Sequence, residues 1–344
     1  MHICTVCNSG MGASMRAKLE TALNKRWYGG IKPNVALRSV AFIYESLTNA
    51  RRYLYRNNIL KSTRVSVPVI VVGNFTVGGT GKTPFTIALV QAMKKRGWNP
   101  GVVSRGYGRE NANPISVHAR SVAKDCGDEP LLIFQRTQCA IRVDSNRVRA
   151  AEYLIEQGCN LIIADDGLQH IRLQRDLEIE LIDHERKYGN GFILPAGPLR
   201  EKARPCDFRV SNGALEDHIE SQNYGMQLIY GDAEKLDGSA HEGLSEFSDH
   251  KVNAIAGIGN PERFFNALMA RGLNINSIPF ADHHDYSLDD FPDDAPLLMT
   301  EKDAVKCRDL GLKDAWCVPV NAALNDNLFD VIDSKLKQLR LLQL

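Results

Sequence analysis

The segment Val67–Thr83, VPVIVVGNFTVGGTGKT, constrains the fold of this chain more than any other stretch. A short β-branched run, Val69–Val72, ends in a glycine. A glycine-rich loop with Gly-Lys-Thr then leads into a helical stretch, residues 84–95. Strand, glycine loop, Gly-Lys-Thr and helix are the context that a phosphate-binding loop requires. Glycines let successive backbone N–H groups converge on an anion, and the helix N-terminus adds its dipole. We therefore predict a nucleotide-phosphate site here.

The residues of this loop differ in the chemistry that each would supply. Lys82 would reach the β- and γ-phosphates, and the Thr83 hydroxyl would ligate Mg²⁺. The general pattern has its first glycine where this chain has Thr76, but Gly78 and Gly79 supply the needed flexibility. The predicted nucleotide-binding segment is Thr76, Val77, Gly78, Gly79, Thr80, Gly81, Lys82 and Thr83.

A second signal lies at residues 161–169, LIIADDGLQ, where an apolar strand ends in Asp165 and Asp166. In a P-loop enzyme, an acid at such a strand end helps to hold Mg²⁺, directly or through water. His170 would either reach the same site or orient the two acids. Together with the phosphate loop, the pair predicts a magnesium site.

Composition limits the remaining possibilities. A chain of 344 residues is expected to form about two domains. Its formal net charge of +1 gives no signal for nucleic acid, and nothing in the sequence indicates an obligate protein partner. The eight cysteines are scattered, which favours reduced thiols in the cytosol. The chain contains no run of 18 apolar residues and no secretory signal near its start.

The N-terminal part has two predicted regions. Residues 1–20, with Cys4 and Cys7, are an extension of unknown role. Residues 21–64 are strongly basic and contain a helical period. One face of this predicted helix is apolar: Ala36, Val40, Ile43, Tyr44, Leu47, Ala50 and Leu54. The opposite face is polar: Arg38, Glu45, Asn49, Arg52 and Arg56. Such a helix either lies on an anionic membrane surface or packs on the protein's own core with a solvated basic face.

After the phosphate loop, strands and helices continue to alternate through residues 65–210, which we predict to form a P-loop domain. Residues 101–104 are an expected strand, and the Arg105–Arg109 loop after it would touch phosphate or sugar, or be a plain turn. The segment Asp125–Pro130, DCGDEP, begins a helix with Asp128 and Glu129 in its first turn. There Asp128 would cap the helix or face the γ-phosphate.

The alternation of strands and helices is interrupted near residue 210 by a polar stretch, residues 211–250. We predict a smaller α/β domain over residues 211–344. Its expected elements are strands at residues 252–255, 297–300 and 316–318 and a helix at residues 261–270. The cluster Ala281–Asp285, ADHHD, would line the cleft between the domains. Thr300–Asp303, TEKD, resembles a guanine-reading pattern but has its lysine one place late, which favours ATP over GTP.

These motifs in combination resemble the tetraacyldisaccharide 4'-kinases of lipid A biosynthesis. The resemblance covers roughly residues 22–320 and rests on VPVIVVGNFTVGGTGKTP, VVSRGYG, GDEP, DDGLQH, FILPAGPLRE, AGIGNPERFF, ADHH and MTEKDAVKC. It implies an α/β fold in which a P-loop NTPase kinase domain with a parallel-rich sheet is joined to a smaller C-terminal α/β domain and an N-terminal amphipathic helix. It also implies transfer of the γ-phosphoryl of ATP, with Mg²⁺, to the 4'-hydroxyl of a tetraacyldisaccharide 1-phosphate, which gives lipid IVA.

The resemblance carries particular roles onto this sequence. The family's catalytic aspartate falls on Asp128 and its partner histidine on His283, beside the phosphate-loop Lys82. The nucleotide side adds Arg147 and His170. The metal side would comprise Thr83, Asp165, Asp166 and Glu201.

Because the family's substrate carries acyl chains, the resemblance also favours the membrane-surface interpretation of the basic helix. It implies a peripheral enzyme on the cytoplasmic face of the bacterial inner membrane. Two other classes stay open from the residues alone. One is a P-loop kinase of a soluble small molecule, and the other is a nucleotide-dependent assembly ATPase. Val77, where one class of such ATPases has a signature lysine, argues against the latter.

Overall fold

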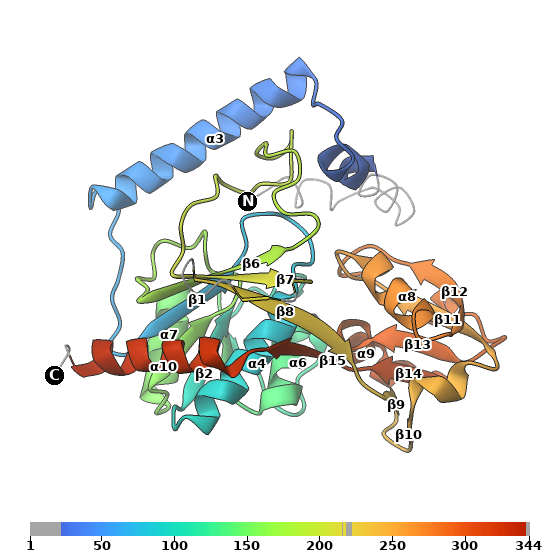
Figure 1. Cartoon of the computed structure of the whole chain (residues 1–344). Helices are drawn as coiled ribbons and strands as arrows, with labels where there is room; N and C mark the ends of the chain where they lie inside the picture. The colour runs from blue at the N-terminus through green and yellow to red at the C-terminus, as the bar shows by residue number, and fades with distance from the viewer. Residues whose placement is uncertain (1–21, 215, 218–221, 342–344) are drawn as a thin grey trace.

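The computed structural model describes residues 22–214, 216–217 and 222–341. The extension predicted at residues 1–20 therefore lies outside the described residues. Two β-sheets lie side by side, and the long helix α3 (Val35–Arg56) crosses above the loops of the larger one (Figure 1). A shorter helical segment, residues 22–28, precedes it. This arrangement matches the α/β fold class predicted from the sequence.

The larger sheet has nine strands within the described residues, in the order β15-β8-β7-β6-β1-β5-β2-β4-β3. The two edge strands, β15 and β3, pair antiparallel, and the seven strands between them run parallel. The strands are β1 (Val69–Gly73), β2 (Pro100–Ser104), β3 (Ile115–Ser116), β4 (Ala140–Val143), β5 (Leu161–Ala164), β6 (Leu177–Asp183), β7 (Phe208–Asn212), β8 (Asn223–Tyr230) and β15 (Val320–Leu324). The central position of β1 places the end of that strand in the middle of the sheet's carboxyl edge.

Both faces of this sheet are covered, which explains why β1 reads as an unbroken apolar run. Ile70 and Val72 point into one core, and Val69 and Val71 point into the other. The helices α4 (Lys82–Lys95), α6 (Asp128–Thr137) and α10 (Asp326–Leu341) supply the first core, and α7 (Arg147–Glu156) supplies the second. The short helix α5 (Ala123–Cys126) leads into α6.

The second sheet has six strands within the described residues, in the order β10-β9-β14-β13-β11-β12. They are β9 (Ala233–Lys235), β10 (His241–Glu242), β11 (Lys251–Ala256), β12 (Asn274–Pro279), β13 (Leu297–Thr300) and β14 (Ala315–Val318). The helix α8 (Pro261–Met269) packs on one face and α9 (Glu301–Cys307) on the other. Three short 3-10 turns complete the unit, at Leu244–Phe247, Leu288–Asp290 and Arg308–Leu310.

The predicted division of the chain after residue 210 does not match these two sheets. β8, β15 and α10 fall within the predicted second domain, yet they belong to the larger sheet and its core. The smaller unit is therefore an insertion between β8 and β15. The polar appearance of residues 211–250 concealed β8, whose last four residues are exposed or half-buried.

The helix α3 turns most of its apolar residues away from the protein. Val40, Ile43 and Leu47 are 49%, 60% and 65% exposed, and Ala41 is its one fully buried residue. The alternative in which this face packs on the protein's own core is therefore wrong. None of the helices in the described ranges is long and apolar enough to cross a membrane.

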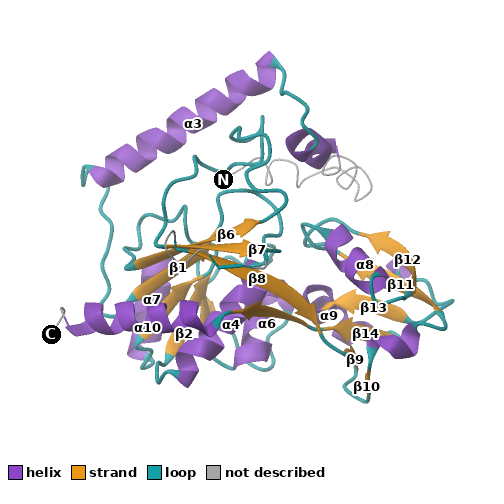
Figure 2. Cartoon of the chain, in the orientation of Figure 1, coloured by secondary structure: helices purple, strands orange, loops and turns teal. Residues whose placement is uncertain are grey.

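Polar residues of α3 hold it to the loops between β6 and β7, which rise toward the helix (Figure 2). Glu45 pairs with Lys202 at 2.5 Å, and Arg52 pairs with Glu201 at 3.1 Å. The Arg38 guanidinium lies over the Phe192 ring, 5.7 Å from its centroid. The basic side of the helix thus faces the unit built on the nine-stranded sheet.

Candidate active site

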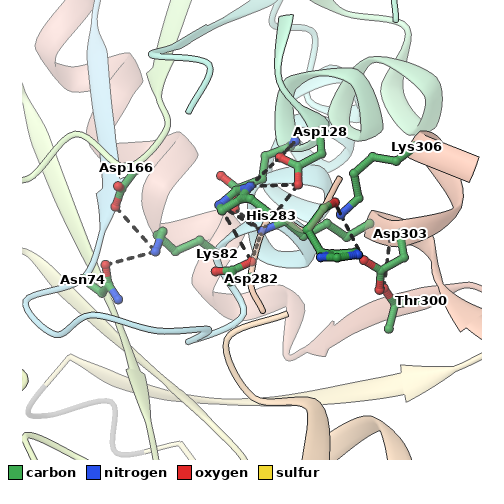
Figure 3. Close-up of polar contacts among 12 residues, drawn as sticks. Asn74, Lys82, Asp128, Asp166, Asp282, His283, Thr300, Asp303 and Lys306 are labelled. Atoms are coloured by element: carbon green, nitrogen blue, oxygen red, sulfur yellow. Dashed lines mark hydrogen bonds and ion pairs between the residues drawn. The ribbon is translucent and has the colours of Figure 1, made fainter. Parts of the chain in front are cut away.

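The phosphate loop follows β1 and runs directly into α4, as predicted. Gly81 precedes the helix with a φ of +89°, a conformation that favours glycine. The Lys82 ammonium lies 3.0 Å from the Asn74 side-chain oxygen and 3.5 Å from Asp166 Oδ1 (Figure 3). The lysine is thus held beside the loop by a neutral and an acidic oxygen, which a phosphate would replace.

The two predicted acids follow β5, which pairs in parallel with β1, and this brings them to the same sheet edge as the loop. Asp166 has a φ of +47° and accepts two hydrogen bonds from Arg200, at 2.8 and 3.0 Å. Burial alone would raise the pKa of Asp166, but Arg200 and Lys82 lower it below its usual range. Its carboxylate is therefore charged and already paired with two cations.

Asp165 is in a different state. It is fully buried, and its Oδ2 has no hydrogen-bond partner. Burial, with the charges of Glu129 and Asp166, raises the pKa of Asp165 to about 7. A buried carboxylate oxygen that has no hydrogen-bond partner and lies beside a phosphate loop is suited to binding a cation.

This arrangement fits Mg²⁺, which takes one or two carboxylates and completes its shell with phosphate oxygens and water. Asp165, with its free carboxylate oxygen, and Thr83, in the first turn of α4, would hold it. Glu201 has its carboxylate paired with Arg52 at 3.1 Å and Gln169 at 3.3 Å. Within the residues that the structure describes, no three His, Cys, Asp or Glu side chains form a cluster that holds a metal by itself. The ion would therefore depend on the nucleotide's oxygens.

Arg147 and His170 lie close to Asp165 and Asp166. The buried Arg147 guanidinium donates to the backbone oxygens of Asp165 and Asp144, at 3.2 and 3.3 Å. Burial lowers the pKa of Arg147 to about 10 and, together with Arg147, lowers that of His170 to about 4. His170 Nε2 is buried without a partner. His170 is therefore neutral at physiological pH.

Asp128 and His283 meet across the two sheets, although 155 residues separate them. Asp128 is the first residue of α6, and His283 lies in the loop after β12. His283 Nδ1 lies 2.9 Å from Asp128 Oδ2 and 3.1 Å from Oδ1 (Figure 3). His283 has a φ of +61°, a conformation that costs a non-glycine residue about 1–3 kcal/mol and is common at functional sites. The Tyr107 ring lies 4.7 Å from the imidazole.

The charges around this pair set its protonation. Burial alone would raise the pKa of Asp128, but Lys302 and His283 lower it. Burial alone would lower the pKa of His283, but the charge of Asp282 and the hydrogen bond to Asp128 raise it. The Asp128 carboxylate is therefore ionised, and the charged form of His283 is favoured by Asp282 and Asp128 and opposed by Lys302.

The second sheet also contacts the phosphate loop itself. The loop between β11 and α8 lies directly on Gly78 and Gly79, and a Cβ added at Gly259 would be 2.4 Å from the Gly79 nitrogen. Nearby, Arg263 on α8 pairs with Asp183 at 2.6 Å. The smaller unit therefore contacts both halves of the predicted site.

Sequence reasoning missed several residues that complete this site. Asn74 directly follows β1, and Arg200 lies within the LPAGPLRE loop. Tyr107 belongs to the Arg105–Arg109 loop, for which a plain turn is the alternative. Lys302 belongs to the TEKD stretch, which resembles a guanine-reading pattern and a motif of the family, but no site residue is predicted there. A polar residue at the end of a buried strand was the available signal for Asn74. No local pattern marks Lys302, because its partners come from distant segments.

A cavity of about 740 Å³ lies away from these residues, between α6, α9 and the segments that join the sheets. Its lining includes Arg136, Glu301, Gly231 and Pro319 and none of the predicted site residues. The Glu301 carboxylate forms an ion pair with Arg136, with 2.5 Å between Glu301 Oε1 and Arg136 Nη1. The chemistry described above therefore lies at the phosphate loop and not in this cavity.

Comparison with known proteins gives a consistent result. A sequence model of the family described as tetraacyldisaccharide-1-P 4'-kinase matches residues 33–337. A tetraacyldisaccharide 4'-kinase of Stenotrophomonas maltophilia is 47% identical over 326 residues, which are 91% of this chain and 96% of that protein. One of Methylobacillus flagellatus is 44% identical over 325 residues, 92% of this chain and 96% of that protein. A crystal structure of LpxK from Aquifex aeolicus in complex with ATP is similar with a TM-score of 0.73 at 26% identity. That match covers 88% of this chain and 98% of that one.

Proposed function

This chain belongs to the tetraacyldisaccharide-1-P 4'-kinase family, and on that premise we propose that it transfers the γ-phosphoryl group of ATP to the 4'-hydroxyl of a tetraacylated disaccharide 1-phosphate. The product would be lipid IVA, an intermediate of lipid A biosynthesis. The observation that carries the proposal is the contact between Asp128 and His283 at 2.9 Å, in a chain whose second sheet also lies on the Gly-Lys-Thr loop.

At the nucleotide end, the chain supplies positive charge and backbone donors. Lys82 would leave Asn74 and Asp166 and move onto the β- and γ-phosphate oxygens, where it spreads the charge that develops during transfer. Thr83 and Asp165 would hold Mg²⁺, which supplies charge neutralisation for the phosphate oxygens when it is bound. Arg200 keeps Asp166 paired, so that Lys82 is free to exchange partners.

At the acceptor end, Asp128 would accept the proton of the sugar hydroxyl. Its lowered pKa keeps it ionised at neutral pH, and His283 orients the carboxylate through Nδ1. Because phosphoryl transfer passes through a loose transition state, holding the hydroxyl in line matters more than strong basicity. The two residues would act as one unit.

The outer face of α3 supports a membrane surface as partner. Its apolar side chains project away from the protein, with Phe42 69% exposed and Leu47 65% exposed. A helix of this kind buries its apolar face at the lipid interface without spanning the bilayer. Since the proposed substrate carries acyl chains, we place the enzyme peripherally on the cytoplasmic face of the bacterial inner membrane. The free thiols of the described cysteines fit a reducing compartment.

The membrane proposal is tested by sedimentation with anionic liposomes. The triple variant Phe42→Ser, Ile43→Ser and Leu47→Ser should lose most liposome binding and keep its ATP affinity. A matched control is Met269→Ser with Leu288→Ser, which removes exposed apolar side chains elsewhere. Equal binding by the triple variant and the wild type would show that α3 does not contact lipid.

The kinase proposal is tested by transfer of ³²P from labelled ATP to a tetraacyldisaccharide 1-phosphate. Labelled lipid is the expected product. ATP hydrolysis that is unaffected by the lipid would instead favour a nucleotide-dependent assembly ATPase. Transfer to soluble sugars in preference to the lipid would favour a kinase of a small molecule.

A further inference from the structure

Lys302 lies where the two sheets meet, although it belongs to none of the predicted site motifs. It is the second residue of α9 in the smaller unit, and its side chain is only 14% exposed. Its ammonium lies 2.9 Å from Asp282 Oδ1 and 3.1 Å from Glu129 Oε1. One lysine thus joins two parts of the protein. The first is α6 of the kinase body, which is the unit built on the nine-stranded sheet, and the second is the loop that carries His283.

The same ammonium also lies beside the proposed catalytic pair. It is 3.8 Å from Asp128 Oδ2 and 3.5 Å from His283 Nε2. Asp128 therefore has His283 on one side and Lys302 on another. Figure 3 shows Asp128, His283 and Asp282 close together. The carboxylates of Glu129 and Asp282 both bind Lys302, so its charge is held between them and does not move to a phosphate.

Hydrogen bonds at the start of α9 determine the orientation of Lys302. Thr300 caps α9 and accepts the backbone N–H of Asp303, while the Asp303 carboxylate accepts the Thr300 hydroxyl and the backbone N–H of Gly257. These bonds fix the first turn of α9 against the loop that lies on the phosphate loop. The TEKD stretch is therefore a cap that directs one lysine at the interface between the sheets, and not a base-reading motif.

We propose that Lys302 is a positioning residue of the kinase reaction, which fixes Asp128 and His283 in contact by joining Glu129 to Asp282 across the two sheets. This inference rests on the proposed function. The lysine neither touches the reacting atoms nor exchanges a proton. It acts through the placement and charge of Asp128.

Charge is the second part of the role. Groups from each neighbouring segment face Asp128: Glu129 from its own helix, Asp282 and His283 from the loop after β12, and Lys302 and Lys306 from α9. Among these, Lys302 opposes most strongly the effect of burial, which alone would raise the pKa of Asp128. Removal of the lysine should therefore raise that pKa, and with it the pH at which activity is lost on acidification.

The decisive variant is Lys302→Met, which keeps the length of the side chain and removes its charge. It should lower kcat by about 10²-fold, since a small displacement of a catalytic group has effects of that size, and leave KM for ATP near the wild-type value. The acid limb of its pH–kcat/KM profile should move to higher pH. Lys302→Arg, which retains the charge, should recover part of kcat and return the limb toward its wild-type position.

Lys302→Met leaves carboxylates without their cation, so a second variant guards against misfolding. Lys302→Met with Asp282→Asn removes one negative charge together with the lysine. It should fold and still show the low kcat and the shifted acid limb. Arg263→Met is the matched control, because it breaks another ion pair between the sheets, to Asp183, and should leave the limb in place.

Near-normal kcat in Lys302→Met, or in Lys302→Met with Asp282→Asn, would overturn the positioning role. A lowered kcat with an unmoved acid limb and a matching loss in Tm would overturn it as well. Failure of the wild-type enzyme to phosphorylate the disaccharide is a separate outcome, which would overturn the proposed function itself.

Discussion

The nucleotide half of the site and the Asp128–His283 half differ in how their residues are brought together. Asn74, Lys82 and Thr83 lie within ten residues of one another, and Asp165 and Asp166 follow the strand that pairs with β1. All of these belong to one sheet. Asp128 and His283, by contrast, come from two sheets, and Lys302 and Glu129 join those sheets beside them.

The difference suggests a division of labour. The nucleotide half is held rigid by the buried core on both faces of β1, so it should keep its geometry whatever the smaller unit does. The Asp128–His283 half, which we call the acceptor half, exists only while the two sheets are docked. Binding of ATP should therefore be separable from transfer, and the following experiments test that separation.

The largest expected effect comes from breaking the pair that spans the sheets. Asp128→Ala and His283→Ala should each lower kcat by about 10²–10⁴-fold, the range typical of acid–base groups, while ATP affinity stays near normal. Because the two act as a unit, the double variant should be little worse than the poorer single one. Steady-state kinetics of the three variants, with melting curves, would measure this.

Additive effects in that series, with stability losses larger than the losses in kcat, would mean that Asp128 only caps α6 and that His283 only packs in the smaller unit.

The nucleotide half is tested by Lys82→Ala. Loss of one preorganised charge contact should lower kcat by about 10²–10³-fold. Unlike the previous variants, this one should leave the contact between Asp128 and His283, and hence the docking of the sheets, unchanged. Kinetics should be paired with small-angle scattering. Near-normal turnover in a folded protein would remove Lys82 from the site.

A smaller effect should follow from Gly259→Ala, which changes neither set of reacting groups. The added methyl group would press on the Gly79 nitrogen and force the smaller unit away from the phosphate loop. We expect kcat to fall by up to about 10²-fold, because the acceptor half is displaced, with little change in ATP affinity. Gly243→Ala, where a Cβ meets only ordinary contacts, is the control. A selective loss of ATP affinity would contradict the separation.

The smallest effect concerns pH and stability. His283 has a raised pKa in the folded protein, so its contribution is fully present below the unfolded pKa of about 6.5 and is lost as pH rises through the folded value. The difference in Tm between the wild type and His283→Gln should therefore shrink as the pH is raised. Thermal melts at a series of pH values would check this, and a difference that grows with pH would refute it.

The sequence predicted the strands and the helix around the nucleotide half because their determinants are local. A β-branched strand, a glycine loop and Gly-Lys-Thr each depend on neighbouring residues, and β1, α4 and β5 lie where the pattern placed them. The orphaned oxygen of Asp165 was not predictable, because it depends on Arg200 pairing with Asp166 instead.

The acceptor half could be identified only through the family resemblance. Nothing near Asp128 in the sequence distinguishes a helix cap from a catalytic group, and its carboxylate does accept the Glu129 N–H at 2.9 Å. The domain boundary failed for a related reason. Strand pairing between β8 and β15 is a contact between distant segments, and a local change in polarity does not reveal it.

The insertion of the smaller unit between β8 and β15 has a consequence for synthesis on the ribosome. The chain leaves the larger sheet after Tyr230 and returns at Val320, and the Gly231 N–H donates to the Pro319 oxygen where the two crossings meet, at 2.9 Å. The kinase body is thus completed last, when β15 covers the edge of β8 and α10 covers the core with Leu328, Phe329 and Ile332. A chain that stops at residue 319 would carry an intact Gly-Lys-Thr loop on a body with an open strand edge and bare apolar surface. Such a fragment would be prone to aggregation and proteolysis, although it contains the residues of both halves of the site.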